Sequence, residues 1–297
     1  MRVVHWQIVA LIGICACAKP DTDTDTNDTD VEGPPVFEDF INTTTEATGE
    51  SSCFTGTWLT QSVDPTKVGT AAATGRVLDF QKDTPVPDAT LTVWYADSVA
   101  GTADATGTTV TDGTVSLTLP TCQAFTYETA TNPDLEQTVD TFEAHQIFGP
   151  DEPDRIFNSV SDSTYKIIPS LLGVSVDPDK GVIAGTAFDC IDANIEHAQV
   201  VVKDGAGNIP ESLIVKYFVD KFPNRDQPDT SPDGLWTAIN VPEGDWTVEM
   251  YVYRAATGEH EMIGSTVLTV YPNSINISNI YTGYSDGVKY PAECLAL

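Results

Sequence analysis

Apolar and polar residues alternate through much of the chain beyond residue 50. Val115, Leu117 and Leu119 are separated by Ser116 and Thr118, so the three apolar side chains lie on one face of an extended segment. The same alternation recurs at 91–95, 246–252 and 275–277. This period of two predicts β-strands that each bury one face.

Turn residues separate these segments, and the pattern contains no long amphipathic helix. Asp, Gly, Pro and Asn gather at 112–113, 204–208, 233–234 and 242–245. One short helix is predicted at 162–173, where Pro169 breaks or kinks it. Strands at this spacing are typical of all-β sandwiches.

The order of strands and turns repeats along the chain. A strand that opens at Gly75 returns at Gly185, 110 residues later, and the Asp-Gly turn at Asp112 returns at Asp233, 121 residues later. A nearly constant offset predicts duplication of one fold unit. The alternative is a chance alignment of common turn residues.

The two halves resemble the carboxypeptidase regulatory-like domain, a small transthyretin-like β-sandwich. Six residues of the second half carry the resemblance: Ala198, Asp233, Gly234, Pro242, Gly244 and Trp246. The first half departs from the pattern at 120–125, where the turn glycine is missing. The resemblance implies a scaffold without catalytic residues, which in carboxypeptidases assists the folding or positioning of a neighbouring enzyme domain.

We therefore predict an all-β chain with two tandem antiparallel β-sandwiches of the Ig-like or transthyretin-like kind. The predicted units are a lipoprotein signal peptide with its lipobox at 1–17, a disordered acidic linker at 18–50, the first sandwich at 51–150, a connector with a short helix at 151–180, and the second, carboxypeptidase regulatory-like sandwich at 181–297. The linker prediction rests on its Asp, Thr and Pro content, because such a segment buries too little apolar surface to become ordered.

The signal-peptide prediction rests on an apolar run at 8–16. This run is roughly nine residues long where a bilayer span needs about twenty, so it is too short for an anchor helix. Segment 14–17 resembles the lipobox of bacterial lipoproteins, with Cys17 as the acylated residue; Cys15 fits worse because the bulky Ile14 precedes it. The resemblance implies a lipid anchor in a membrane. Ala18, in place of the Asp that commonly marks inner-membrane retention, favours the outer membrane, with the protein periplasmic or surface-exposed.

Acidic residues dominate the charge. The chain has 44 Asp and Glu against 14 Lys and Arg, a formal net charge of −30. Duplex DNA, RNA and anionic lipid headgroups are repelled by such a surface. Nucleic acid is therefore excluded as a partner.

Four cysteines lie beyond the signal and linker. These are Cys53, Cys122, Cys190 and Cys294. An even number of cysteines in an exported chain predicts disulfides, and four cysteines allow three alternative pairings. We favour Cys53 with Cys122 and Cys190 with Cys294, because each bond then closes within one half. Free buried thiols are the alternative, and zinc fits less well because no two of these cysteines have ligand spacing.

Clustered acidic residues are the candidate metal site. Asp177 and Asp179 lie in one loop, and Asp226 and Asp229 lie in another. Carboxylate oxygens in loops at the end of a sandwich suit Ca²⁺, and calcium is the one cofactor that the sequence suggests. The alternative is a solvated acidic surface.

Catalytic motifs give little support for an enzyme. Segment 283–287 matches the Gly-x-Ser-x-Gly string around Ser285, but no histidine follows it, as a hydrolase of that type requires. We therefore predict that the chain is not an enzyme but a membrane-anchored surface or periplasmic lipoprotein. It would act as a binding or structural module for a protein or carbohydrate ligand. The alternative is an accessory protein that assists an extracellular hydrolase, or a weakly recognisable enzyme.

Overall fold

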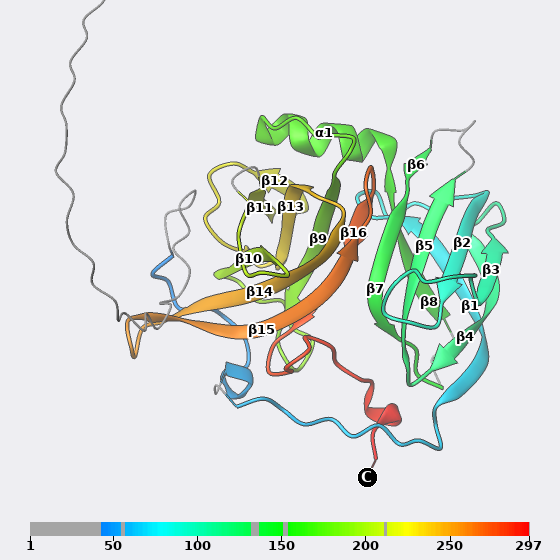
Figure 1. Cartoon of the computed structure of the whole chain (residues 1–297), viewed down its shortest axis with the longest axis horizontal. Coiled ribbons are helices and arrows are strands. Elements are labelled where there is room, and N and C mark those ends of the chain that lie inside the picture. Colours follow the sequence, from blue (N-terminus) through cyan, green and yellow to red (C-terminus); the bar gives the residue numbers. More distant parts are fainter. Residues whose placement is uncertain (1–42, 55–56, 132–136, 151–153, 211–212, 297) are drawn as a thin grey trace, which may run out of the picture. The chain divides into compact units, whose positions relative to one another are not determined.

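Strands dominate the computed structural model, which describes residues 43–54, 57–131, 137–150, 154–210 and 213–296 (Figure 1). The strands of the first half are β1 (Gly69–Asp79), β2 (Ala89–Trp94), β3 (Ala105–Thr108), β4 (Thr114–Thr121), β5 (Ala124–Thr131), β6 (Thr138–Val139), β7 (Thr141–Ile147) and β8 (Asp154–Ser161). Those of the second half are β9 (Gly181–Phe188), β10 (Ala198–Asp204), β11 (Ile214–Val219), β12 (Phe222–Asn224), β13 (Leu235–Val241), β14 (Gly244–Arg254), β15 (Glu259–Val270), β16 (Ile275–Ile277) and β17 (Ile280–Tyr281). The helical elements are η1 (Ser51–Phe54), α1 (Asp162–Leu172) and η2 (Ala292–Cys294). The predicted all-β class is confirmed.

The first half folds as a β-sandwich. A sheet with the order β4-β1-β8-β6 forms one layer, and β7, β5, β2 and β3 form the other. Alternating residues of these strands fill the space between the layers, among them Val115 and Leu119 from β4 and Leu91 and Val93 from β2. These four side chains are at most 3% exposed, so the period-two pattern identified the buried faces correctly.

The second half is also a sandwich with its own core. Strands β10, β14 and β15 form one layer, and β12, β11, β13 and β9 form the other. The alternating side chains Trp246, Val248, Met250 and Val252 of β14 all belong to the core between them. Each half therefore encloses a separate apolar interior, as the sequence predicts.

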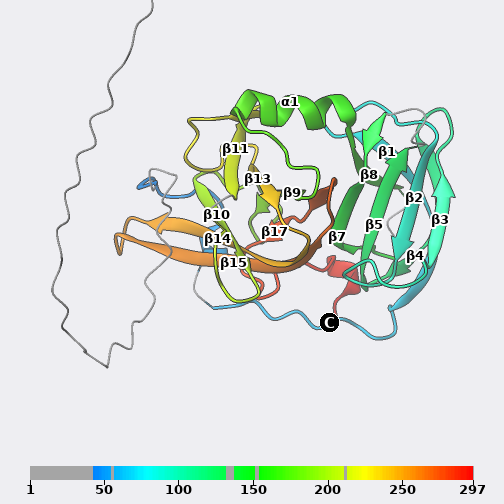
Figure 2. The same cartoon turned by 45° about the horizontal axis from the view of Figure 1, so that its top comes forward.

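β16 joins the two halves through backbone hydrogen bonds. It pairs in parallel with β7, where Ile275 is opposite Thr141, and with β9, where Ile275 is opposite Val182. The resulting sheet has the order β12-β11-β13-β9-β16-β7-β5-β2-β3, with β17 attached to β9 (Figures 1 and 2). One sheet therefore runs through both sandwiches.

Equivalent backbone hydrogen bonds occur at corresponding positions of the two halves. In the first half, the Val77 amide donates to the Gly113 carbonyl at 2.9 Å. In the second half, the Ala187 amide donates to the Gly234 carbonyl at 2.9 Å. The two donors are 110 residues apart and the two acceptors 121 residues apart, which are the offsets of the sequence repeat.

A buried threonine repeats in the same way. The Thr109 hydroxyl accepts a hydrogen bond from the Ala89 amide, and the Thr230 hydroxyl accepts one from the Ala198 amide, both at 2.9 Å. Each hydroxyl also donates to a backbone carbonyl at 2.7 Å. Chance alignment of turn residues does not produce matched buried contacts of this kind, so the structure supports duplication.

α1 lies where the sequence predicts a helix, but Pro169 does not end it. The helix runs from Asp162 to Leu172, with the Ser161 side chain capping its first turn. Gly173 ends it in a left-handed conformation with φ of 70°, and its amide donates to Ser170. The predicted break at Pro169 is therefore wrong, and a C-terminal glycine cap ends the helix instead.

The disulfides are Cys53–Cys190 and Cys122–Cys294, with Cα atoms 5.6 and 5.2 Å apart. The four predicted cysteines are thus all bonded, but the predicted pairing, Cys53 with Cys122 and Cys190 with Cys294, is wrong. Both observed bonds connect residues of different halves of the sequence.

The disulfide pairing follows from crossed chain ends, by which we mean that each end of the folded chain packs on the half that is remote from it in sequence. Cys53 and Phe54 lie in the core of the second half, next to Cys190. At the other end, the Cys294 carbonyl accepts a hydrogen bond from the Asp64 amide, and its side chain clusters with Cys122. Each end of the folded chain therefore packs on the half that is remote in sequence.

The proposed domain limits, 51–150 and 181–297, stay predictions. The structure adds that β8, inside the predicted connector, is a strand of the first sandwich. Cys17, the signal peptide at 1–17 and most of the linker at 18–50 lie outside the described residues. Among the described residues, no helix is both long and apolar enough to cross a bilayer.

Candidate functional site: a cavity beneath α1

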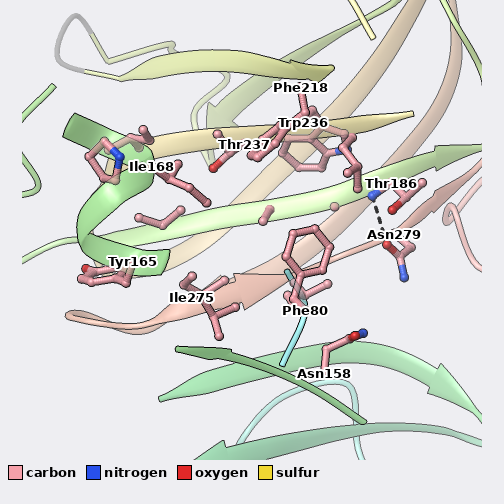
Figure 3. Close-up of a pocket in the computed structure, with 18 of the residues that line it drawn as sticks. Phe80, Asn158, Tyr165, Ile168, Thr186, Phe218, Trp236, Thr237, Ile275 and Asn279 are labelled. Carbon is pink, nitrogen blue, oxygen red and sulfur yellow. Dashed lines mark hydrogen bonds between the residues drawn. The ribbon is translucent and has the colours of Figure 1, made fainter. Parts of the chain in front are cut away.

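A cavity of about 280 Å³ lies between α1 and the outer face of the sheet formed by β13, β9 and β16 (Figure 3). Its walls are mainly aliphatic and aromatic. They include Phe80, Val160, Ile168, Val182, Ile239 and Ile275. We call this space the α1 cavity.

Strand alternation places one row of β9 side chains in the α1 cavity. Ile183 and Ala187 point into the core of the second sandwich, so Val182, Ala184 and Thr186 point to the opposite face. The same rule directs Thr237 and Ile239 of β13 to this face. An apolar sheet face needs a cover, and α1 provides it.

The polar groups of the cavity wall are only partly satisfied by hydrogen bonds within the described residues. The Thr237 hydroxyl donates to the Ile183 carbonyl at 2.9 Å. The Tyr165 hydroxyl and the Trp236 indole nitrogen, by contrast, are buried and have no hydrogen-bond partner among the described residues. Burial raises the pKa of the Tyr165 phenol above its usual value, so it stays neutral.

One end of the cavity is polar, as Figure 3 shows for Thr186, Asn279 and Asn158. The Asn279 side-chain oxygen accepts a hydrogen bond from the Thr186 amide at 3.0 Å. The Asn279 side-chain nitrogen donates to Glu143 at 3.3 Å, and that of Asn158 donates to the same carboxyl at 3.0 Å. Shared contacts with Glu143 therefore hold the two asparagines side by side.

Glu143 is the buried acid behind this polar end. It is 3% exposed and also accepts hydrogen bonds from the Tyr127 hydroxyl and the Gln146 amide. Burial raises the pKa of Glu143, although the hydrogen bonds from Tyr127 and Asn158 act in the opposite direction. Because four donors already point at the carboxyl, its role in this arrangement is to orient its neighbours.

The acidic residues predicted to bind calcium lie in separate surroundings. Asp177 forms an ion pair with Lys180 at 3.7 Å, and Asp226 is exposed. Asp229 is buried, with an oxygen 3.2 Å from the His197 ring. Within the described ranges, no three His, Cys, Asp or Glu side chains come together to hold a metal ion. Calcium binding at these residues and at Asp179 stays a prediction.

Ser285 lies exposed in a turn after β17, where the Gly287 amide donates to the Tyr284 carbonyl. A nucleophile elbow requires the serine between a strand and a following helix. Here the residues after Gly287 lead to the short η2 turn and the Cys294 disulfide. The local structure thus agrees with a turn residue.

Comparisons with known proteins identify no family. No protein-family model matches the chain, and no curated protein matches it. Among solved structures, it is similar to the Bacillus anthracis TIE protein, with 15% identity and a TM-score of 0.23 over 72% of this chain and 34% of that chain. The chain thus spans about a third of that protein's length.

Two pilins give similar values. The shaft pilin SpaA from Lactobacillus rhamnosus GG is 10% identical, with a TM-score of 0.22 over 71% of this chain and 97% of that chain. The minor pilin GBS52 from Streptococcus agalactiae is 9% identical, with a TM-score of 0.23 over 71% and 94%. Similarities this low carry no inference about the function of this chain. The resemblance to the carboxypeptidase regulatory-like domain stays a prediction.

The sequence reasoning missed the α1 cavity. The helix at 162–173 and the strand at 275–277 are both visible in the apolar pattern, but nothing in that pattern shows that they enclose the same space. One signal was available: β9 carries apolar or small residues on both faces, at 182–187. A strand that is apolar on both faces is covered on both sides.

Proposed function

We propose that this protein is a membrane-anchored, non-catalytic module of the cell envelope that binds a small apolar ligand in the α1 cavity. The α1 cavity is the observation that carries the proposal. Ligand sites are concave, mostly apolar and equipped with a few polar groups, and the α1 cavity has these three properties. The second proposal is a protein or glycan ligand bound at the exposed loops. None of the contacts among the described residues supports it.

Size and lining support a small ligand. An apolar cavity of about 150 Å³ is large enough to bind benzene. The α1 cavity is about 280 Å³ and has aromatic walls from Phe80 and Phe188, so a two-ring molecule fits. The disulfides support the envelope assignment, because such bonds persist in oxidising compartments outside the cytosol.

Ala184→Phe tests ligand binding. Ala184 lines the cavity from the centre of β9, so a phenyl ring there occupies the ligand's space. Naphthalene at about ten times its Kd should raise the melting temperature of the wild-type protein by roughly 3 to 5 °C. The same naphthalene concentration should leave the melting temperature of Ala184→Phe unchanged.

Ala72→Phe is the matched control. Ala72 is an exposed residue of β1, so this variant adds the same ring to a strand without filling the cavity. It should keep the wild-type response to naphthalene. An unchanged melting temperature in the wild-type protein, or an equal shift in Ala184→Phe, would contradict the proposal.

Cys17→Ser tests the anchor. Thioether attachment of a lipid requires the sulfur of Cys17, so the variant should lose incorporation of labelled palmitate and leave the membrane fraction. The measurement is labelling and fractionation of cells that express the full chain. Normal labelling and membrane retention of Cys17→Ser would refute the lipid anchor while leaving the cavity proposal open to its own test.

A further inference from the structure

Two polar atoms at the polar end of the α1 cavity are not used by the protein. The Thr186 hydroxyl and the side-chain oxygen of Asn158 take part in no hydrogen bond among the described residues, although both residues line the cavity. The neighbouring Thr237 hydroxyl, in contrast, is bonded within the sheet. The polar end thus retains hydrogen-bonding capacity, as do the Tyr165 hydroxyl and the Trp236 indole nitrogen of the same wall.

Glu143 fixes how these atoms are presented. Its carboxyl accepts from the Asn158 side-chain nitrogen at 3.0 Å, which sets the orientation of the amide and leaves the oxygen as the remaining acceptor. The same carboxyl holds Asn279, whose oxygen is bonded to the Thr186 amide. A hydroxyl such as that of Thr186 both donates and accepts. The polar end therefore offers one acceptor and one group that does both.

We propose that the ligand of the α1 cavity is a neutral molecule with an apolar body and one hydroxyl-like head group, and that the head group lies between Thr186 and Asn158. This inference rests on the proposed function and specifies its ligand. A hydroxyl head can donate to the Asn158 oxygen and accept from Thr186, so both groups are satisfied at once.

Charge argues against an ionised head group. The chain carries a net charge of −30, and Glu143 lies directly behind the polar end, so an anion is repelled. A cation would have to compete with the four donors that already point at Glu143. Burying either ion against the apolar walls would also cost far more than burying a neutral hydroxyl.

Thr186→Val tests the head-group position. Valine keeps the shape of threonine, suits a strand and removes only a hydroxyl that has no partner among the described residues. The probes are 2-naphthol and naphthalene, which share the same body and differ in one hydroxyl. The readout is the ratio of their dissociation constants, measured by calorimetric titration of the full folded chain.

The ratio of the naphthalene Kd to the 2-naphthol Kd should fall about tenfold from wild type to Thr186→Val, while the naphthalene Kd itself stays constant. Thr237→Val is the matched control, because it removes a cavity hydroxyl that is already bonded to Ile183. Its ratio should equal that of the wild type.

Four results would overturn the inference. An unchanged ratio in Thr186→Val would show that the head group does not use Thr186. A fall of this ratio in Tyr165→Phe instead would place the head group at the opposite end of the cavity, where the Tyr165 hydroxyl has no partner within the described ranges. Absence of binding of either probe to the wild-type protein would overturn both the inference and the proposed function, whereas equal binding of both probes would overturn the inference alone.

Discussion

Gly75 and Gly185 occupy equivalent positions in the two halves, and neither position has room for a side chain. A β-carbon at Gly185 would lie 2.1 Å from the Ser278 carbonyl oxygen, and one at Gly75 would lie 2.2 Å from the Phe157 ring. In each half, a strand in parallel pairing crosses next to the glycine, at β16–β17 and at β8. The glycines that marked the repeat in the sequence are therefore sites of close approach.

Gly185→Ala should lower the free energy of unfolding by about 1 to 3 kcal/mol, since the new methyl group meets a backbone atom that can move little. Urea denaturation of the purified chain measures the effect. Gly205→Ala is the control, because a β-carbon there has no atom within 4 Å. Its effect should stay within about 0.5 kcal/mol. Equal stability of the two variants would contradict the close approach at Gly185.

At the scale of single elements, local sequence patterns predicted whether a segment is a strand or a helix better than they predicted which other elements it contacts. The alternation at 275–277 predicted a strand, and β16 forms there. What the alternation did not show is that β16 pairs with β7 on one side and β9 on the other, across the two halves. Pairing depends on which edges meet in space, and a three-residue strand carries too few side chains to specify that.

For α1, too, the sequence predicts the helix itself but not where the helix packs. Its N-terminal serine cap and its C-terminal glycine are readable from the sequence, and the helix lies within the predicted range. Its position over β9 and β13 is a tertiary property. The α1 cavity arises because α1 and Phe80 cover this sheet face without filling it (Figure 3).

At the scale of the whole molecule, both disulfides tie one chain end to the remote half. Cys53–Cys190 spans 137 residues and Cys122–Cys294 spans 172. Together with β16, they make the two sandwiches one cross-linked body within the described residues. A module built in this way resists separation of its halves.

Replacing Cys53 and Cys190 together with serine should lower the free energy of unfolding by about 2 to 5 kcal/mol, because the unfolded chain regains the entropy of a long loop. Chemical denaturation under non-reducing conditions measures this loss. Peptide mapping of the wild-type protein provides the matching check on connectivity. A peptide that links Cys53 with Cys122 would contradict the crossed chain ends.

The sequence by itself determined the strand pattern, the duplication, the short helix and the bonded state of four cysteines, because each of these depends on residues close together or on side-chain chemistry. Tertiary structure alone decided the disulfide partners, the shared sheet and the α1 cavity. These features bring Cys53 to Cys190, and Glu143 to Asn158 and Asn279, across long stretches of chain. Local periodicity shows which face of a strand is buried, but contacts between distant segments are set only when the apolar faces pack together.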